Sequence, residues 1–301
     1  MGLDLFTREI EETIENKIIL PLGDADFRRA CYVVGELQAL LYANIPDDKR
    51  ISYGRYYTIK TLSAYLNQQL ENEGLPVFEF ATYLFENSLY PTEKGVALGM
   101  LSYCGETDLQ AVIPYFLEAA SRQEWEVREN AQAFARRLIK AHPQQMKELY
   151  LQLVHSEDRF IRRFVSESLR PVSENRWFQK DPQYPLSILR HLFYEHAAYP
   201  RTSVGNNLSD WARKEPEMVY DIVAELAASG NKDAFWIAKR ACRNLVKKDP
   251  LRVMDLLGVD QYKYKKRIHR REDIVKNADD LAPGSSGTDP SENKPGAVGV
   301  D

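Results

Sequence analysis

The sequence predicts an all-α chain whose helices stack into an α-α superhelix, a solenoid of two-helix repeats. Three observations support this fold class. Apolar residues recur at helical spacing through nearly every segment, and no stretch shows the alternation of a strand bounded by hairpin turns. Prolines divide the chain at intervals of helical length. The second half repeats itself with periods of 34, 39 and 37 residues, the size of a stacked helix pair.

The expected helices follow one another along most of the chain. Proline lacks an amide donor and clashes with the preceding turn, so it marks their boundaries. The boundary prolines are Pro21, Pro46, Pro76, Pro91, Pro143, Pro171, Pro200 and Pro250. Helices are expected at residues 26–43, 53–72, 77–87, 92–103, 108–121, 125–141, 144–154, 158–170, 184–194, 201–213, 216–229, 233–248 and 250–257. The longest expected loop between them is 172–184.

Four segments carry the internal repeat. They are WEVRENAQAFARRL (125–138), RFIRRFVSESLRP (159–171), YPRTSVGNNLSDWARK (199–214) and FWIAKRACRNLVKK (235–248). Their register aligns Ala131, Val165, Val204 and Ala241. Each segment has an apolar stripe at i, i+3, i+4 spacing, as in Val127, Ala131, Phe134 and Leu138. These stripes are predicted to be core.

The polar face of the repeat gathers acids and bases. In this register Glu129, Glu167 and Asp210 fall on successive helices, displaced by one turn each. Packed helices lie about 8–10 Å apart, so these acids are expected near one another, among cations, in the concave groove. An inter-repeat ladder of acids with arginines, with no other role, explains the same spacing.

Composition excludes several classes of protein. Hydrophobic residues make up 44% of the 301-residue chain and charged residues 28%, which excludes a wholly disordered chain. No apolar run is long enough for a membrane span, and the N-terminus lacks the pattern of a signal peptide. The three cysteines offer neither a disulfide framework nor metal-ligand spacing. A cytoplasmic protein without metal or cofactor is expected.

Charge is distributed unevenly. Residues 1–121 hold 9 Lys/Arg against 18 Asp/Glu, residues 122–271 hold 29 against 19, and residues 272–301 hold 2 against 7. A basic middle region is what a nucleic-acid phosphate backbone needs. The acidic N-terminal third argues against nucleic-acid contact in that part of the chain.

These segments resemble the alkylpurine DNA glycosylases built from HEAT-like repeats, the AlkC/AlkD group, with the AlkC branch the more similar. The resemblance rests on RRFVSESLRP (162–171), SVGNNLSDWARKEPE (203–217), FWIAKRACRNLVKKDP (235–250) and, less closely, WEVRENA (125–131). It covers about residues 110–258. In place of the family's short RPRLPW run, this chain has the longer RPVSENRW (170–177).

The resemblance implies a monofunctional glycosylase. Such an enzyme hydrolyses the N-glycosidic bond of purines alkylated at N3 or N7 in double-stranded DNA and leaves an abasic site. Its carboxylates would be Asp210, Glu167 and Glu129, in that order of preference, and its substrate-binding residues Trp177, Trp125 and Asn206, with Trp211 in reserve. Candidate phosphate contacts are Arg128, Arg162, Arg163, Arg201, Lys239, Arg240, Arg243, Lys247 and Lys248. A monomer is expected.

The expected organisation has four parts. Residues 1–109 form a helical N-terminal part of the solenoid, 110–258 the repeats, 259–282 a basic C-terminal helix and 283–301 a disordered tail. The basic run KYKKRIHRR (263–271) either clamps DNA or is a solvated surface. The alternative function is a non-catalytic repeat module that binds DNA or protein, and the lengthened 170–177 segment favours it.

Overall fold

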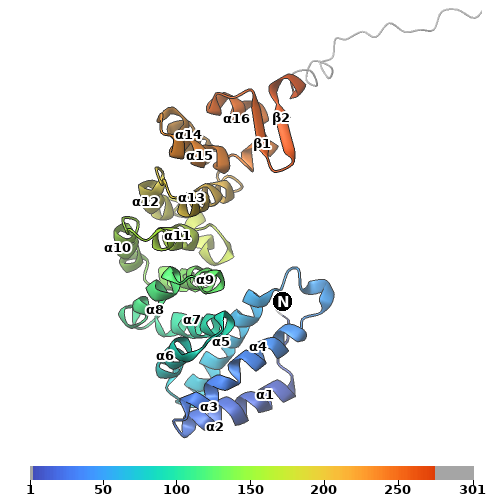
Figure 1. Ribbon diagram of the computed structural model, residues 1–301, viewed down its shortest axis with the longest axis vertical. Coiled ribbons are helices and arrows are strands. Elements are labelled where there is room, and N and C mark those ends of the chain that lie inside the picture. The colour runs from blue at the N-terminus through green and yellow to red at the C-terminus, as the bar shows by residue number, and fades with distance from the viewer. Residues whose placement is uncertain (1–2, 275–301) are drawn as a thin grey trace, which may run out of the picture.

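The computed structural model describes residues 3–274, which form an arc of stacked helices (Figure 1). The N-terminal part of the arc contains α1 (Arg8–Ile14), a π-helical segment (Glu15–Ile19), α2 (Leu20–Gly23), α3 (Phe27–Tyr32), α4 (Val34–Ala43), a 3-10 turn (Asp47–Lys49), α5 (Arg55–Asn72), α6 (Val77–Asn87) and α7 (Pro91–Cys104). None of the described helices is long and apolar enough to cross a membrane.

The repeats continue the arc. They comprise α8 (Leu109–Ser121), α9 (Trp125–Ala141), α10 (Pro143–Leu153), α11 (Arg159–Ser168), a 3-10 segment (Ser173–Gln179), α12 (Gln183–Leu189), a 3-10 turn (Arg190–Leu192), α13 (Ala198–Trp211), α14 (Pro216–Ala228), α15 (Lys232–Ala241), a 3-10 turn (Leu245–Lys247) and α16 (Pro250–Leu257). Figure 1 shows α8, α10, α12 and α14 on the outer side of the arc and α9, α11, α13 and α15 on the inner side. The all-α superhelix is therefore confirmed.

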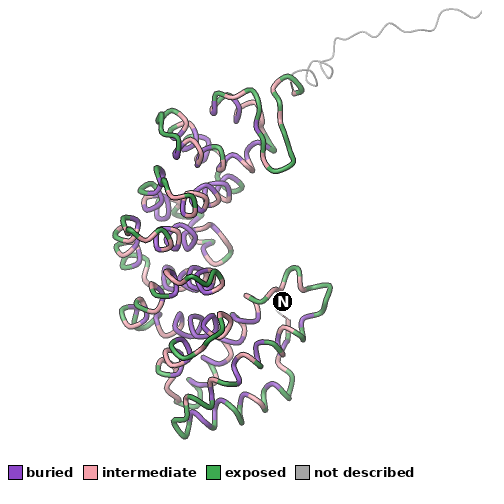
Figure 2. Tube along the Cα trace, in the orientation of Figure 1, coloured by how far each residue is buried: buried purple, intermediate pink, exposed green. Residues whose placement is uncertain are grey.

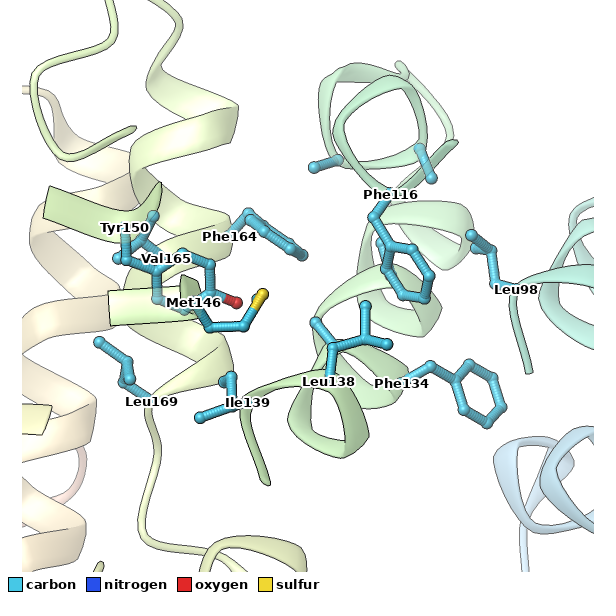
Figure 3. Close-up of a cluster of buried hydrophobic side chains, with 14 of the residues drawn as sticks. Leu98, Phe116, Phe134, Leu138, Ile139, Met146, Tyr150, Phe164, Val165 and Leu169 are labelled. Carbon is cyan, nitrogen blue, oxygen red and sulfur yellow. The ribbon is translucent and has the colours of Figure 1, made fainter. Parts of the chain in front are cut away.

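One core runs along the arc between these two rows of helices (Figure 2). The predicted stripe of α9 is buried in full, from Val127 to Leu138. Figure 3 shows Phe134 and Leu138 among side chains from the neighbouring helices, including Phe116 of α8 and Phe164 of α11. Each inner helix thus places its apolar stripe against the outer row, which leaves its polar face on the concave side.

Residues 8–23 are helical although no helix was expected before residue 26. The side chain of Thr7 caps α1 by accepting a hydrogen bond from the amide of Ile10. Acids follow in the first turn, at Glu9 and Glu11, where they complement the helix dipole. This start signal is present in the sequence, but the expected helices begin only at residue 26.

The expected basic helix at 259–282 is wrong over residues 259–270, whereas residues 271–274 are helical. After α16, Gly258 adopts a left-handed conformation, and the chain forms a hairpin from β1 (Gln261–Tyr264) and β2 (Arg267–Arg270). Tyr262 is buried, so the segment has the period-two pattern of a strand. The expected tail at 283–301 lies outside the described residues.

The segment expected as a loop at 172–184 is ordered locally by hydrogen bonds. It contains the 3-10 segment Ser173–Gln179 and the start of α12. The buried side-chain amide of Asn175 donates to the carbonyls of Ser168, at 2.7 Å, and Arg170, at 2.9 Å. This asparagine therefore fixes the segment to the end of α11.

Candidate active site

The three predicted acids are joined by two arginines in a chain of ion pairs that we call the acid–arginine ladder: Glu129, Arg163, Glu167, Arg170 and Asp210. Arg163 on α11 donates to Glu129 on α9 at 2.6 Å, and its Nη2 lies 3.8 Å from Oε1 of Glu167. Arg170 donates to Glu167 at 3.2 Å and, through Nε, to Asp210 on α13 at 2.9 Å. The ladder follows the repeat register across three inner helices.

The three acids differ in their access to solvent. The side chain of Glu167 is 5% exposed and also accepts a hydrogen bond from Ser203 at 2.6 Å. That of Asp210 is 14% exposed and that of Glu129 is 39% exposed. Glu129 is therefore the member of the ladder most able to meet a ligand, while Glu167 is enclosed by its partners.

Burial and the neighbouring carboxylates shift the pKa of Arg170 in opposite directions. Burial disfavours its charged form, but the carboxylates of Glu167 and Asp210 outweigh burial and raise the pKa of Arg170. The guanidinium is thus held as a cation between two carboxylates. It links the end of α11 to α13, so the ladder stabilises the stacking of repeats as well as placing acids in the groove.

A cavity of about 640 Å³, here called the main cavity, opens beside Glu129. Its aromatic lining is Tyr56 of α5, Tyr90 before α7 and Trp125 at the start of α9. Trp125 is 60% exposed and lies one helical turn before Glu129, so the two share a helix face. A volume of this size lies in the usual range for small-molecule sites. The cavity therefore combines an accessible carboxylate with aromatic walls.

The N-terminal part of the chain supplies one wall of the main cavity. Arg55 and Tyr56 of α5 line it, together with Tyr90. Burial raises the pKa of Tyr56 to about 12, so its hydroxyl stays a hydrogen-bond donor at neutral pH. The net negative charge of residues 1–121 hides this local contribution, and nothing in the sequence pairs α5 with α9.

A second cavity of about 190 Å³ adjoins the main cavity and is lined by four cations, Lys60, Arg136, Arg137 and Lys140. Two of them are already paired: Lys60 with Glu174 at 3.4 Å and Arg137 with Glu106 at 2.7 Å. Arg136 lines both cavities, and burial lowers its pKa. Glu106 and Glu174 also line this cavity, so its four cations leave a net positive charge next to the main cavity.

The other predicted substrate-binding residues lie away from the main cavity. Trp177 packs on Phe178 and Tyr184, with ring centroids 4.6 and 5.0 Å apart, and does not line the cavity. Asn206 accepts a hydrogen bond from Arg240 at 2.9 Å, between α13 and α15. Trp211 is fully buried, which rules out a role on the surface. Trp125 alone of these lines the main cavity.

Arg128 and Arg162, predicted to contact phosphate, are buried and have other partners. Arg128 donates to the carbonyl of Gln123 at 2.8 Å and lies over the ring of Phe160. Arg162 makes two hydrogen bonds to the buried carboxylate of Glu195, at 2.6 and 3.0 Å. These contacts disfavour the phosphate role, because both arginines are largely buried and already have hydrogen-bond partners.

The remaining candidate cations have different environments. Arg163 belongs to the ladder, and Arg201 pairs with Asp233 over the ring of Trp236. The side chains on and just after α15 are more open: Lys239, Lys247 and Lys248 are exposed, and Arg240 and Arg243 are half-buried. The basic surface nearest to solvent therefore lies at the C-terminal end of the arc.

The described residues hold no cluster of three or more His, Cys, Asp or Glu side chains placed to bind a metal ion. The ionisable and aromatic side chains that line the main cavity carry carboxylate, guanidinium, phenol and indole groups. A carboxylate beside aromatic faces suits a cationic ligand.

Comparison with known proteins gives one short match in sequence. No protein-family model matches the chain. A protein of Bacillus subtilis (strain 168), described as uncharacterized protein YhaZ, is 32% identical over 106 residues. The match spans 33% of this chain and 29% of that protein, so most of the relative's length is not covered.

Two solved structures have the same fold. The Pseudomonas fluorescens alkylpurine DNA glycosylase AlkC, bound to DNA containing an abasic site analog, aligns at TM-score 0.53 and 19% identity, over 83% of this chain and 68% of that one. AlkD2 from Streptococcus mutans aligns at TM-score 0.55 and 20% identity, over 69% of this chain and 97% of that one. The chain therefore has the helical-repeat fold of the AlkC and AlkD group, as the motif resemblance implies.

Proposed function

We propose that this protein is a DNA glycosylase of alkylation repair that hydrolyses the N-glycosidic bond of cationic N3- or N7-alkylated purines in double-stranded DNA. The observation that carries the proposal is the partly exposed carboxylate of Glu129 in the main cavity, one helical turn from the exposed ring of Trp125. The AlkC-like fold supports it. The protein would act as a monomer in the cytoplasm, without metal or cofactor.

Cleavage of the N-glycosidic bond of an alkylated purine requires few catalytic groups. A purine alkylated at N3 or N7 is positively charged and already a good leaving group, so no strong general acid is needed. The carboxylate of Glu129 would stabilise the sugar cation that develops as the bond breaks and would orient the attacking water. The rings of Trp125 and Tyr56 would favour a cationic base over a neutral one, by about 0.5–2 kcal/mol.

The other two acids support this site in different ways. Glu167 is enclosed by Arg163, Arg170 and Ser203, which suits a positioning residue that fixes the arginines. Asp210, the preferred acid from the sequence, is held by Arg170, and Arg170 lines the main cavity. We therefore place Glu129 first for direct contact with substrate and keep Asp210 as the second carboxylate.

A second candidate function is a module that binds DNA without cutting it. One observation favours it: every acid of the acid–arginine ladder already has an arginine partner. A ladder that only stacks repeats needs no substrate.

Release of 3-methyladenine and 7-methylguanine from methylated duplex DNA separates the two functions. The glycosylase proposal expects release by the wild type and its loss in Glu129→Gln, with Glu167→Gln and Asp210→Asn as parallel variants. Each variant's melting temperature shows whether its fold is intact. Binding of the duplex without any release by the wild type would refute the glycosylase and leave the binding module.

A further inference from the structure

The C-terminal hairpin, residues 261–271, concentrates positive charge; we call it the basic hairpin. It contains six Lys or Arg residues and no Asp or Glu. In its register Gln261 faces Arg270 and Lys263 faces Ile268, and the tight turn carries Lys265 and Lys266. A two-stranded ribbon is marginally stable by itself, so the hairpin depends on its contacts with the repeats.

The base of the basic hairpin is anchored firmly to the repeats. The buried Tyr262 donates its hydroxyl hydrogen to the carbonyl of Lys239 at 2.6 Å, and Arg243 donates to the hydroxyl of Tyr264 at 3.3 Å. Arg271 pairs with Asp255 of α16 at 2.7 Å. Its two tyrosines therefore hold one face of the hairpin on α15 and the residues just after it, and leave its turn to project.

The projecting cations have no acidic partner among the described residues. The ion pairs of the hairpin involve Arg270 and Arg271, near its base. The side chains without such a pair are all exposed: Lys263, Lys265, Lys266 and Arg267. A cluster of one sign that is not neutralised within the fold is relieved by an anionic partner.

The basic hairpin continues the charged surface of α15. Lys239 and Arg243, the residues that meet its tyrosines, belong to that surface, and Lys247 and Lys248 follow it. Figure 1 shows the hairpin projecting from the C-terminal end of the arc on its open side, the side that the inner helices line. A duplex lying along the inner helices would meet the turn.

We propose that the basic hairpin binds the phosphate backbone of double-stranded DNA outside the main cavity and supplies sequence-independent affinity. A two-stranded ribbon fits the major groove, which places cations on both strands and the turn near phosphates. Protein partners instead favour aromatic anchors at an interface core, and both tyrosines of the hairpin are used to anchor it. The inference rests on the proposed function for the choice of DNA as the anion.

The test is the salt dependence of binding to undamaged duplex DNA by Lys265→Gly combined with Lys266→Gln. Lys265 has φ of 55°, a conformation that glycine adopts more easily, so the double variant should keep the turn. Each lost phosphate contact should lower the slope of log affinity against log salt by about 0.9. The loss of two such contacts should reduce the affinity for duplex DNA by up to about 60-fold at 0.1 M salt.

The matched control is Lys265→Arg combined with Lys266→Arg, which keeps both charges and should bind as the wild type does. Lys263→Gln with Arg267→Gln removes charge from the strands without touching the turn and should also lower the slope. The inference is overturned if both neutralised variants bind duplex DNA with the same affinity and the same salt slope as the wild type while NMR shows that their hairpins are intact.

Failure of the hairpin inference can be distinguished from failure of the proposed function. Base release by the wild type, together with unchanged DNA binding by the neutralised variants, sinks the hairpin inference and leaves the glycosylase. No base release, together with weaker binding by the same variants, sinks the glycosylase and supports the hairpin as a contact of a binding module. Wild-type protein with no salt-dependent affinity for duplex DNA refutes both.

Discussion

Breaking the buried pair of Arg162 and Glu195 should be among the most costly single changes in this fold. The Glu195 side chain is 3% exposed, and Arg162→Met leaves its carboxylate buried without its arginine partner. Removing one member of a buried pair costs about 3–5 kcal/mol in the free energy of unfolding. For a domain of this size that lowers the melting temperature by about 6–20 °C.

The stability lost in Arg162→Met should depend on pH, because the carboxyl group of Glu195 titrates. Burial raises the pKa of Glu195, but the hydrogen bonds from Arg162 and the amide of Ala197 outweigh it, so the pKa lies below its ordinary value of 4.5. Ionised Glu195 therefore stabilises the fold above that value, and the contribution is lost as the pH falls through the folded pKa. The gap between wild type and Arg162→Met should be largest at neutral pH and narrow below about pH 4.5.

Urea unfolding followed by circular dichroism at several pH values measures this gap. Arg190→Met is the matched control, because Arg190 and Glu225 form a bidentate pair at 2.8–3.0 Å with both side chains about half exposed. Such a pair contributes about 0–1 kcal/mol. If Arg162→Met costs no more than Arg190→Met, or if its cost is the same at pH 4 as at pH 7, the assignment of Arg162 to a structural pair is refuted.

Three further predictions concern the groove and its supports. Trp125→Ala should lower the rate of release of a cationic base by about 2–30-fold, and Trp125→Phe should restore most of it, measured with methylated duplex DNA. Asn175→Ala should cost about 1–3 kcal/mol in urea unfolding, because it removes the buried amide that donates to the carbonyls of Ser168 and Arg170. Lys239→Ala with Lys247→Ala should lower the salt slope of duplex binding by up to about 1.8, and an unchanged slope would remove the basic surface on and just after α15 from the interface.

The parts of the fold that repeat are the parts that the sequence predicts best. The stripe from Val127 to Leu138 is set by helical periodicity, and the structure buries it. The proximity of Glu129, Glu167 and Asp210 follows from the register, because equivalent helices stack side by side. Local spacing and one repeat period are sufficient for both predictions.

Features that depend on contacts between unlike segments were not predictable in the same way. Arg162 looks like a groove cation in the repeat register, but its partner Glu195 lies in the irregular segment before α13. The wall of the main cavity formed by Tyr56 comes from α5, which shares no motif with the repeats. Charge alone does not distinguish a buried arginine from an exposed one.

The basic hairpin lies where the sequence predicts a helix, because opposing local preferences meet in this segment. Lysine and arginine are good helix formers, whereas the tyrosines at positions 262 and 264 favour a strand. Burial of Tyr262 against α15 decides between them, and that contact is tertiary.

The central claim is that Glu129 acts on substrate in the main cavity. The most direct test is the single-turnover rate of base release from a duplex with one 7-methylguanine, for the wild type and for Glu129→Gln of equal melting temperature. The account predicts that Glu129→Gln binds the duplex as tightly as the wild type and releases the base at least about 100-fold more slowly. Equal rates of release by the two proteins would contradict it.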